Sequence, residues 1–202
     1  MIGIKVQGIK RKILYHNFQP HELHNIYNSF KDETLKGRRD KVILGLLIYQ
    51  GLRTEELGRL ETNHIKLREG QIDVPGGKRR NGRLLNLEPH QVMEMYDYIL
   101  QVRPEILKIS SQETDALFVS PKGGNEVSNF MSRLMARLKK NHPQLVNAQQ
   151  IRASVITKWL RMYNLREVQY LSGHRFISST ESFMENEMEG LKEEINKFHP
   201  LN

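Results

Sequence analysis

An apolar segment of about a dozen residues, VILGLLIYQGL, begins at Val42 and is followed at once by Arg53. It is too short to cross the hydrocarbon core of a membrane, which takes about 20 residues. Because almost no polar position interrupts it, the segment is typical of a helix that is buried on all sides. We therefore expect a buried helix from Asp40 to Gln50 and a chain that folds around a sizeable core.

Helical spacing of apolar residues recurs on both sides of this segment. Pro20 and Pro89 each occupy the first turn of an expected helix, where the missing backbone N–H is tolerated. After Gly51, Thr54 is expected to cap a short helix that ends near Leu57. Three more helices are expected at 125–140, 147–163 and 165–171, and the acidic end of the chain is helical by composition. The apolar stripes of the two proline-initiated helices are Leu23, Ile26, Tyr27 and Phe30, and Val92, Met95, Tyr96 and Ile99.

Three short runs with β-strand propensity lie between the short helix and Pro89. They are HIKL at 64–67, QIDV at 71–74 and RLLNL at 83–87, and glycine-containing turns separate them. LFVS at 117–120 is expected to be a lone extended segment. The expected fold class is therefore mainly α with a small antiparallel β-sheet (α+β).

The length of 202 residues predicts one compact domain. We divide it into an N-terminal segment over residues 1–18, a body over 19–180 and a C-terminal segment over 181–202.

The chain is strongly basic, and its charge is unevenly distributed. Lysine and arginine number 31 against 23 acidic residues, which gives a net charge of +8 and a pI of about 9.7. Residues 181–202 carry a net charge of −4, so residues 1–180 carry +12. A body this basic favours a polyanionic partner, nucleic acid first, and makes an enzyme of small acidic metabolites a poorer fit.

The chain contains no cysteine, which excludes disulfides, thiolate zinc sites, iron–sulfur clusters and a cysteine nucleophile. His21 and His24 stand at helical spacing, but without a third ligand nearby a polar helix face explains them better than a metal site. We expect no metal and no cofactor. Since the N-terminus also lacks the apolar block of a secretory signal, we expect a soluble protein of the cytoplasm, associated with the nucleoid when it binds DNA.

The loop GGKRRNGR brings Lys78, Arg79, Arg80 and Arg83 close together among glycines. Such a cluster repels itself unless an anion neutralises it, so we expect these four residues to contact DNA phosphates. The alternative is a cluster that serves solubility alone.

Two other arginines emerge from apolar surroundings. Arg53 follows the buried helix directly, and Arg152 lies on a strongly apolar helix beside Ile151 and Val155. A buried or half-buried arginine needs a partner, either a carboxylate or a bound phosphate, which suits its bidentate geometry. Taken singly, each arginine is better explained by a structural ion pair.

Four short motifs follow one another along the chain: GLRTEEL at 51–57, the basic hairpin around Lys78, QQIR at 149–152 and LSGH at 171–174. In order and spacing they resemble the catalytic domain of the tyrosine recombinase (phage integrase, Xer-like) family, over roughly residues 20–198. The resemblance implies a mainly helical domain with a small antiparallel sheet, in agreement with the patterns above. It also implies that an N-terminal DNA-clamping domain is missing, so that residues 1–18 are the remnant of an interdomain linker.

The resemblance implies a set of catalytic residues. Arg53 and Arg152 would neutralise the nonbridging oxygens of a DNA phosphate, and Lys78 would protonate the leaving 5′ oxygen. His174 would hold a nonbridging oxygen or assist proton movement. Glu56, three positions after the first arginine, would orient the arginines without contacting the phosphate itself.

Two positions depart from the family pattern. Gln149 stands where the family usually has histidine, and glutamine can donate a hydrogen bond to phosphate but cannot carry a proton. Phe183 stands nine residues after His174, where the nucleophilic tyrosine is expected, and a phenyl ring has no oxygen to attack phosphorus. We therefore expect a chain that binds DNA without cleaving it, through a deliberate Tyr-to-Phe change or a natural loss of activity.

In the family, a tyrosine hydroxyl attacks a DNA phosphodiester in line, forms a 3′-phosphotyrosyl link and frees a 5′-hydroxyl. The expected function is thus site-specific DNA cleavage and rejoining, as in the integration and recombination of mobile genetic elements. The alternative is a non-cleaving DNA-binding regulatory module. An RNA-binding protein fits less well because no aromatic pair accompanies the basic runs.

Other protomers assembled on DNA are the second expected partner. The acidic C-terminal helix carries an apolar stripe that must be buried, in cis or on a neighbouring protomer, or else it is a plain solvated face. The stripe consists of Met184, Met188, Leu191 and Ile195.

Overall fold

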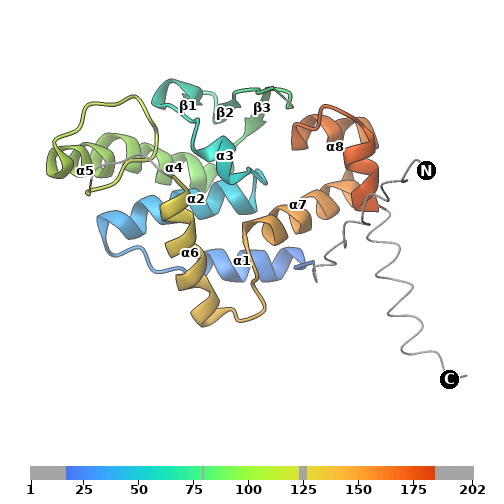
Figure 1. Cartoon of the computed structure of the whole chain (residues 1–202), viewed down its shortest axis with the longest axis horizontal. Coiled ribbons are helices and arrows are strands. Elements are labelled where there is room, and N and C mark those ends of the chain that lie inside the picture. Colours follow the sequence, from blue (N-terminus) through green and yellow to red (C-terminus); the bar gives the residue numbers. More distant parts are fainter. Residues whose placement is uncertain (1–16, 79, 123–126, 185–202) are drawn as a thin grey trace, which may run out of the picture.

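The computed structural model describes residues 17–78, 80–122 and 127–184 (Figure 1). The expected buried helix is α2 (Leu35–Ile48), in which every residue from Arg39 to Ile48 is buried. It begins earlier than its apolar pattern indicated because the Thr34 hydroxyl accepts a hydrogen bond from the backbone N–H of Gly37 and caps the helix. Residues 36–39 are polar or glycine, so they carry no hydrophobic signal of their own.

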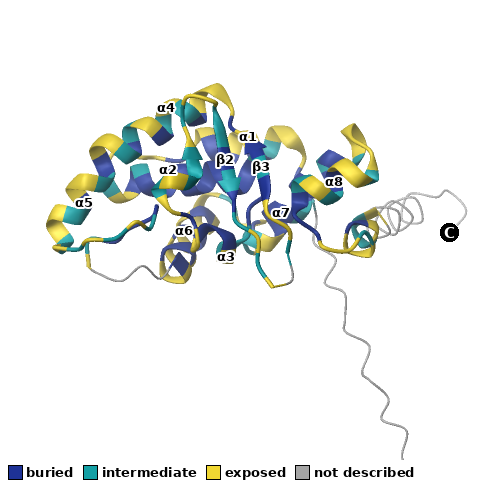
Figure 2. Cartoon of the chain, turned by 90° about the horizontal axis from the view of Figure 1, so that it is seen from above, coloured by how far each residue is buried: buried dark blue, intermediate teal, exposed yellow. Residues whose placement is uncertain are grey.

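Helix α2 lies at the centre of the molecule. It contacts α1 (Pro20–Asn28), α4 (Pro89–Asp97) and α7 (Ala148–Met162), and beyond its first turn its residues are buried (Figure 2). The expected stripe of α1 is confirmed, since Leu23, Ile26, Tyr27 and Phe30 are all buried.

The three predicted strands form one antiparallel sheet in the order β1 (Ile65–Lys66), β2 (Gln71–Val74) and β3 (Arg83–Asn86). Ile72 of β2 pairs with Ile65 on one side and with Leu85 on the other. Because side chains alternate along a strand, Ile72, Val74 and Leu85 share the face that is buried against the helices. The mainly helical fold with a small antiparallel sheet is thus confirmed.

The prediction that Tyr96 belongs to the buried stripe of α4 is wrong. Tyr96 is 50% exposed, whereas Met95 and Tyr98 are buried and the Tyr98 hydroxyl donates a hydrogen bond to the carbonyl of Leu117. The helix continues through a π-helical turn, η2 (Tyr98–Val102), into α5 (Arg103–Ser110), and its buried stripe runs through Val102. The segment 117–120 belongs to no strand, but it is not the lone extended segment that was expected: residues 117 and 118 form a bend, and the backbone N–H of Leu117 donates to the carbonyl of Leu60 at 2.8 Å. The Tyr98 hydrogen bond ties the segment to this helix.

The remaining elements frame the site. Helix α3 (Thr54–Leu57) and the 3-10 turn η1 (Thr62–His64) precede the sheet, and α6 (Val127–Asn141) and α8 (Leu165–Ser172) flank α7 in sequence. Residues 178–184 are again helical. Thr54 does not cap α3: the capping position belongs to Arg53, whose backbone N–H donates to the Glu56 carboxylate.

The beginning of the packed body can be placed from two contacts. The backbone N–H of Phe18 donates to the Ser154 hydroxyl, the Asn17 amide donates to the Thr157 hydroxyl, and Phe18 is buried. Asn17 and Phe18 therefore pack with the body. The remainder of the N-terminal segment and residues 188, 191 and 195 of the apolar stripe lie outside the described residues. Within the described ranges, no helix is both long and apolar enough to span a membrane.

Candidate active site

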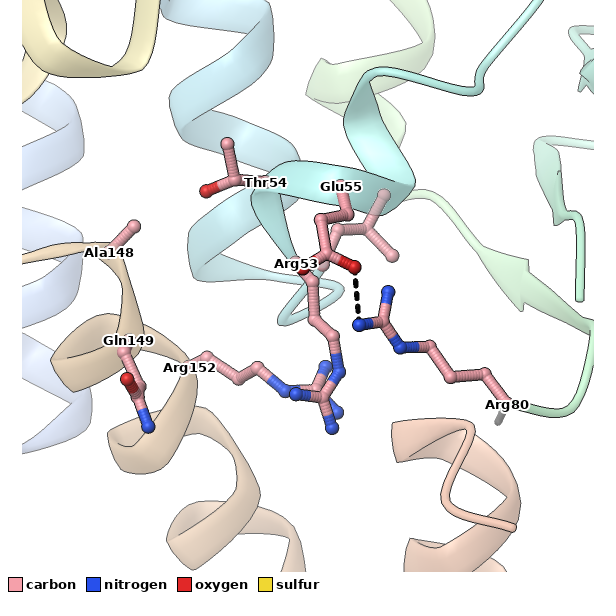
Figure 3. A pocket seen from close by; sticks show the side chains of 8 residues that line it. Arg53, Thr54, Glu55, Arg80, Ala148, Gln149 and Arg152 are labelled. Atoms are coloured by element: carbon pink, nitrogen blue, oxygen red, sulfur yellow. Dashed lines mark hydrogen bonds and ion pairs between the residues drawn. The ribbon is translucent and has the colours of Figure 1, made fainter. Parts of the chain in front are cut away.

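Two arginines that are about a hundred residues apart in sequence meet in one pocket. Arg53 stands at the start of α3, and Arg152 lies on α7, which packs against α2. Their side chains extend toward the same part of the pocket in Figure 3. The pocket has a volume of about 210 Å³. Its lining residues are Leu52, Arg53, Thr54, Glu55, Arg80, Ala148, Gln149 and Arg152.

The Arg152 side chain is held by backbone carbonyls. It is 4% exposed and donates to the carbonyl of Ser172 at 2.6 Å and to that of Gly51. Gly51 has a φ of +57°, a conformation that favours glycine and turns its carbonyl toward the arginine. Burial, and then the neighbouring charge of Arg53, lowers the pKa of Arg152 to about 9. The guanidinium is thus rigid, charged at neutral pH and short of a counterion.

Arg53 is half-buried and less fully satisfied. Its buried Nε has no hydrogen-bond partner. Burial lowers the pKa of Arg53, and the charges of Arg80 and Arg83 act in the same direction, while Glu56 opposes them. A buried donor without an acceptor is costly, so this pocket suits an oxygen-rich anion.

His174 forms the wall behind Arg152 and is 4% exposed. Its Nε2 lies 3.3 Å from Nη2 of Arg152, and its Nδ1 lies 2.9 Å from the hydroxyl oxygen of Thr180. Because a guanidinium only donates, Nε2 accepts, and the ring proton resides on Nδ1 and is donated to Thr180. Burial, followed by the charges of Arg152 and Arg53, lowers the pKa of His174 to about 3, so the ring is neutral at pH 7.

Phe183 lies beside this histidine. The centroids of the two rings are 5.8 Å apart, with an interplanar angle of 17°, and Phe183 packs partly buried against the core. The position nine residues after His174 is thus brought back to the same site by the helical segment 178–184.

Lys78 lies outside the arginine pocket. It is exposed and lines a neighbouring pocket of about 270 Å³ together with Glu55, Arg59, Gly77 and Arg80. The hairpin that carries it is attached to the end of α8, because Arg175 donates to the carbonyl of Lys78 at 3.1 Å. Arg79 lies outside the described residues.

Arg83 was expected to contact phosphate, and the structure contradicts this. Its side chain has no exposed area and is bound at both ends of its guanidinium by the Glu56 carboxylate, at 3.0 Å each. Its Nε donates to the carbonyl of Leu171 at 2.8 Å. Arg83 is the first residue of β3 and points to the core side of the sheet, which no strand propensity reveals.

The ion pair with Arg83 also changes the role of Glu56. Its side chain binds the guanidinium of Arg83 and the backbone N–H of Arg53. Glu56 therefore fixes the start of α3, and with it the position of Arg53, through the backbone. Burial alone would raise the pKa of Glu56, but the hydrogen bonds and charge of Arg83 outweigh it and hold the pKa below its usual range.

Three of the residues near the site carry no sequence signal. Arg59 lines the Lys78 pocket, Thr180 bonds His174, and Arg175 holds the hairpin. Each is a single residue without a pattern, and only its position in the fold gives it a role. Gln149, in contrast, lies where its motif predicted, exposed at the edge of the arginine pocket.

The sequence profile of the phage integrase family matches residues 16–189. The tyrosine recombinase XerC of Natranaerobius thermophilus is 34% identical over 172 residues, which make up 81% of this chain and 56% of the relative. XerD of Staphylococcus aureus is 28% identical over 169 residues, or 82% of this chain and 56% of the relative. The chain thus spans little more than half of the length of these relatives.

Solved structures show the same fold. XerA recombinase superposes with a TM-score of 0.70 at 21% identity, covering 98% of this chain and 68% of that one. XerH recombinase, in a post-cleavage complex with a palindromic difH substrate, gives a TM-score of 0.72 at 17% identity, covering 89% and 52%. With most of the chain matched by the family profile and a relative above 30% identity, the chain belongs to the phage integrase family.

Proposed function

We propose that residues 17–184 form the catalytic domain of a site-specific DNA recombinase, in which the arginine pocket binds the phosphodiester at the point of strand exchange. One observation carries this proposal. The adjacent guanidiniums of Arg53 and Arg152 share a pocket with Arg80, and Nε of Arg53 and Nη1 of Arg80 are buried donors without an acceptor. A phosphate supplies oxygens and negative charge to all three arginines at once.

The same arrangement suits the chemistry of strand cleavage. In-line attack on phosphorus places extra negative charge on the nonbridging oxygens, and two fixed guanidiniums neutralise it without reorganisation. Neutral His174 accepts a hydrogen bond from Arg152 in the free protein and so keeps that guanidinium turned toward the pocket. A bound phosphate would favour the protonated form of the histidine, which could then donate to a phosphate oxygen.

Lys78 is proposed to supply a proton to the leaving 5′ oxygen. Its place on an exposed hairpin beside the pocket means that it must move toward the phosphate when DNA binds. Gln149 is proposed to donate a hydrogen bond to a phosphate oxygen from the other edge.

Phe183 limits the chain to binding. It occupies the position beside His174 where a nucleophilic hydroxyl would be needed, and its ring supplies none. A DNA-binding module that does not cleave is therefore the second candidate function, favoured by this residue alone.

Restoring the tyrosine tests the proposal. Phe183→Tyr, incubated with a nicked suicide duplex that carries a site selected by binding to this chain, should yield a covalent protein–DNA adduct. The adduct should survive denaturing electrophoresis and disappear after protease digestion, whereas the unaltered chain should form none.

Two further variants serve as controls. Phe183→Tyr with Arg53→Ala should fold and give little adduct, because the Arg53 side chain is only half-buried and makes few structural bonds. Phe183→Tyr with Arg152→Ala should also lose the adduct, with folding checked by circular dichroism. Binding without any adduct in Phe183→Tyr would favour the non-cleaving module instead.

A further inference from the structure

Besides the buried Arg83–Glu56 pair, a second ion pair joins the hairpin to α3 across the site. Nη2 of Arg80 lies 2.5 Å from a carboxylate oxygen of Glu55, drawn as the dashed line in Figure 3. Both residues line the arginine pocket and also the pocket that contains Lys78. The pair is therefore the wall that separates the two pockets.

Glu55 is an acidic residue in strongly basic surroundings. It is the only acid among the described residues that line either pocket, and five cations surround it. Arg53 and Arg152 line the first pocket, Arg59 and Lys78 line the second, and Arg80 lines both. A carboxylate presents two oxygens to a guanidinium much as a phosphate does, so Glu55 holds the place that an anion from solution would otherwise take.

The pair is also weakly held. The Glu55 side chain is 65% exposed and that of Arg80 is 22% exposed, and only one of the two terminal nitrogens of Arg80 is satisfied. Because exposed ion pairs contribute little to stability, a phosphate can displace the carboxylate.

We propose that Glu55 is an affinity-determining residue that occupies Arg80 in the free protein and must release it when a DNA phosphate enters. The proposal rests on the proposed function, because it takes the arginine pocket to be the phosphate site. When Arg80 turns from Glu55 to the phosphate, the wall between the pockets opens. Lys78 and Arg59 then lie in one cationic groove with Arg53 and Arg152.

Removing the competing charge tests this directly. Glu55→Gln keeps the shape of the side chain and should bind a nonspecific 30-base-pair duplex about three- to fivefold more tightly in fluorescence anisotropy, the equivalent of one exposed ion pair. Glu69→Gln, an equal change of charge at an exposed residue that lines neither pocket, is the matched control. It should change affinity by less than about twofold because salt screens its charge from the site.

A double-mutant cycle separates the specific contact from general electrostatics. In an Arg80→Ala background, Glu55→Gln should improve binding no more than Glu69→Gln does, because the residue that Glu55 occupies is gone. An equal gain in both backgrounds, or no gain in the Arg80-containing protein, would overturn the proposal.

The proposed function fails by a different result. If Arg53→Ala leaves affinity for the duplex unchanged, the arginine pocket is not the phosphate site. If Arg53→Ala weakens binding while Glu55→Gln has no effect, the pocket binds phosphate and only the role of Glu55 is wrong.

Discussion

Two arginine–glutamate pairs join the same hairpin to the same short helix, and they differ in burial. Arg83 and Glu56 form a two-point ion pair that is almost completely shielded from solvent. Arg80 and Glu55, which lie close to these two residues in sequence, form a one-point pair in which the glutamate side chain is 65% exposed. Removing water makes a charge pair indispensable to the fold, whereas leaving it in water makes it exchangeable. The pair of Arg83 and Glu56 therefore stabilises the structure of the site. The pair of Arg80 and Glu55 can break when a phosphate binds.

Breaking the buried pair should have the largest effect. Arg83→Met leaves the Glu56 carboxylate buried without its partner and should lower the free energy of unfolding by about 3–5 kcal/mol. Chemical denaturation monitored by circular dichroism measures this. Arg80→Met, the same replacement at the exposed pair, should cost no more than about 1 kcal/mol. Similar losses for both variants would remove the distinction between the pairs.

Acid should weaken the buried pair of Arg83 and Glu56. The pKa of Glu56 in the folded protein lies below its unfolded value, so its contribution to stability is present above the unfolded pKa and is lost as pH falls through the folded one. Thermal unfolding between pH 7 and pH 3 should show this loss, and Glu56→Gln should flatten it.

For DNA binding, Arg80 should matter more than Arg83, the reverse of their order for stability. The expected change in free energy is the smallest of the three. Arg80→Ala should reduce the slope of log affinity against log salt by about 1, because one phosphate contact is lost. A folded variant of Arg83 should keep the slope, since the buried guanidinium reaches no phosphate. Titrations at several salt concentrations give both slopes, and an unchanged slope in Arg80→Ala would return that residue to a purely structural role.

The local elements could be predicted because their signals are local. Proline at the first turn and apolar spacing located α1 and α4, and alternation between turns located the three strands. The order of the four motifs also predicted which family the chain resembles. The start of α2 and the exposed Tyr96 were missed because a cap and the phase of a stripe depend on single contacts.

The sequence by itself determined the elements, the excess of positive charge and the absence of a hydroxyl at position 183. Tertiary structure alone decided which arginines face solvent, which nitrogen of His174 carries the proton, and that Glu55 lies against Arg80. The physical reason is that propensity and composition act over a few neighbouring residues. The state of a charge depends instead on burial and on partners that the fold brings from distant parts of the chain.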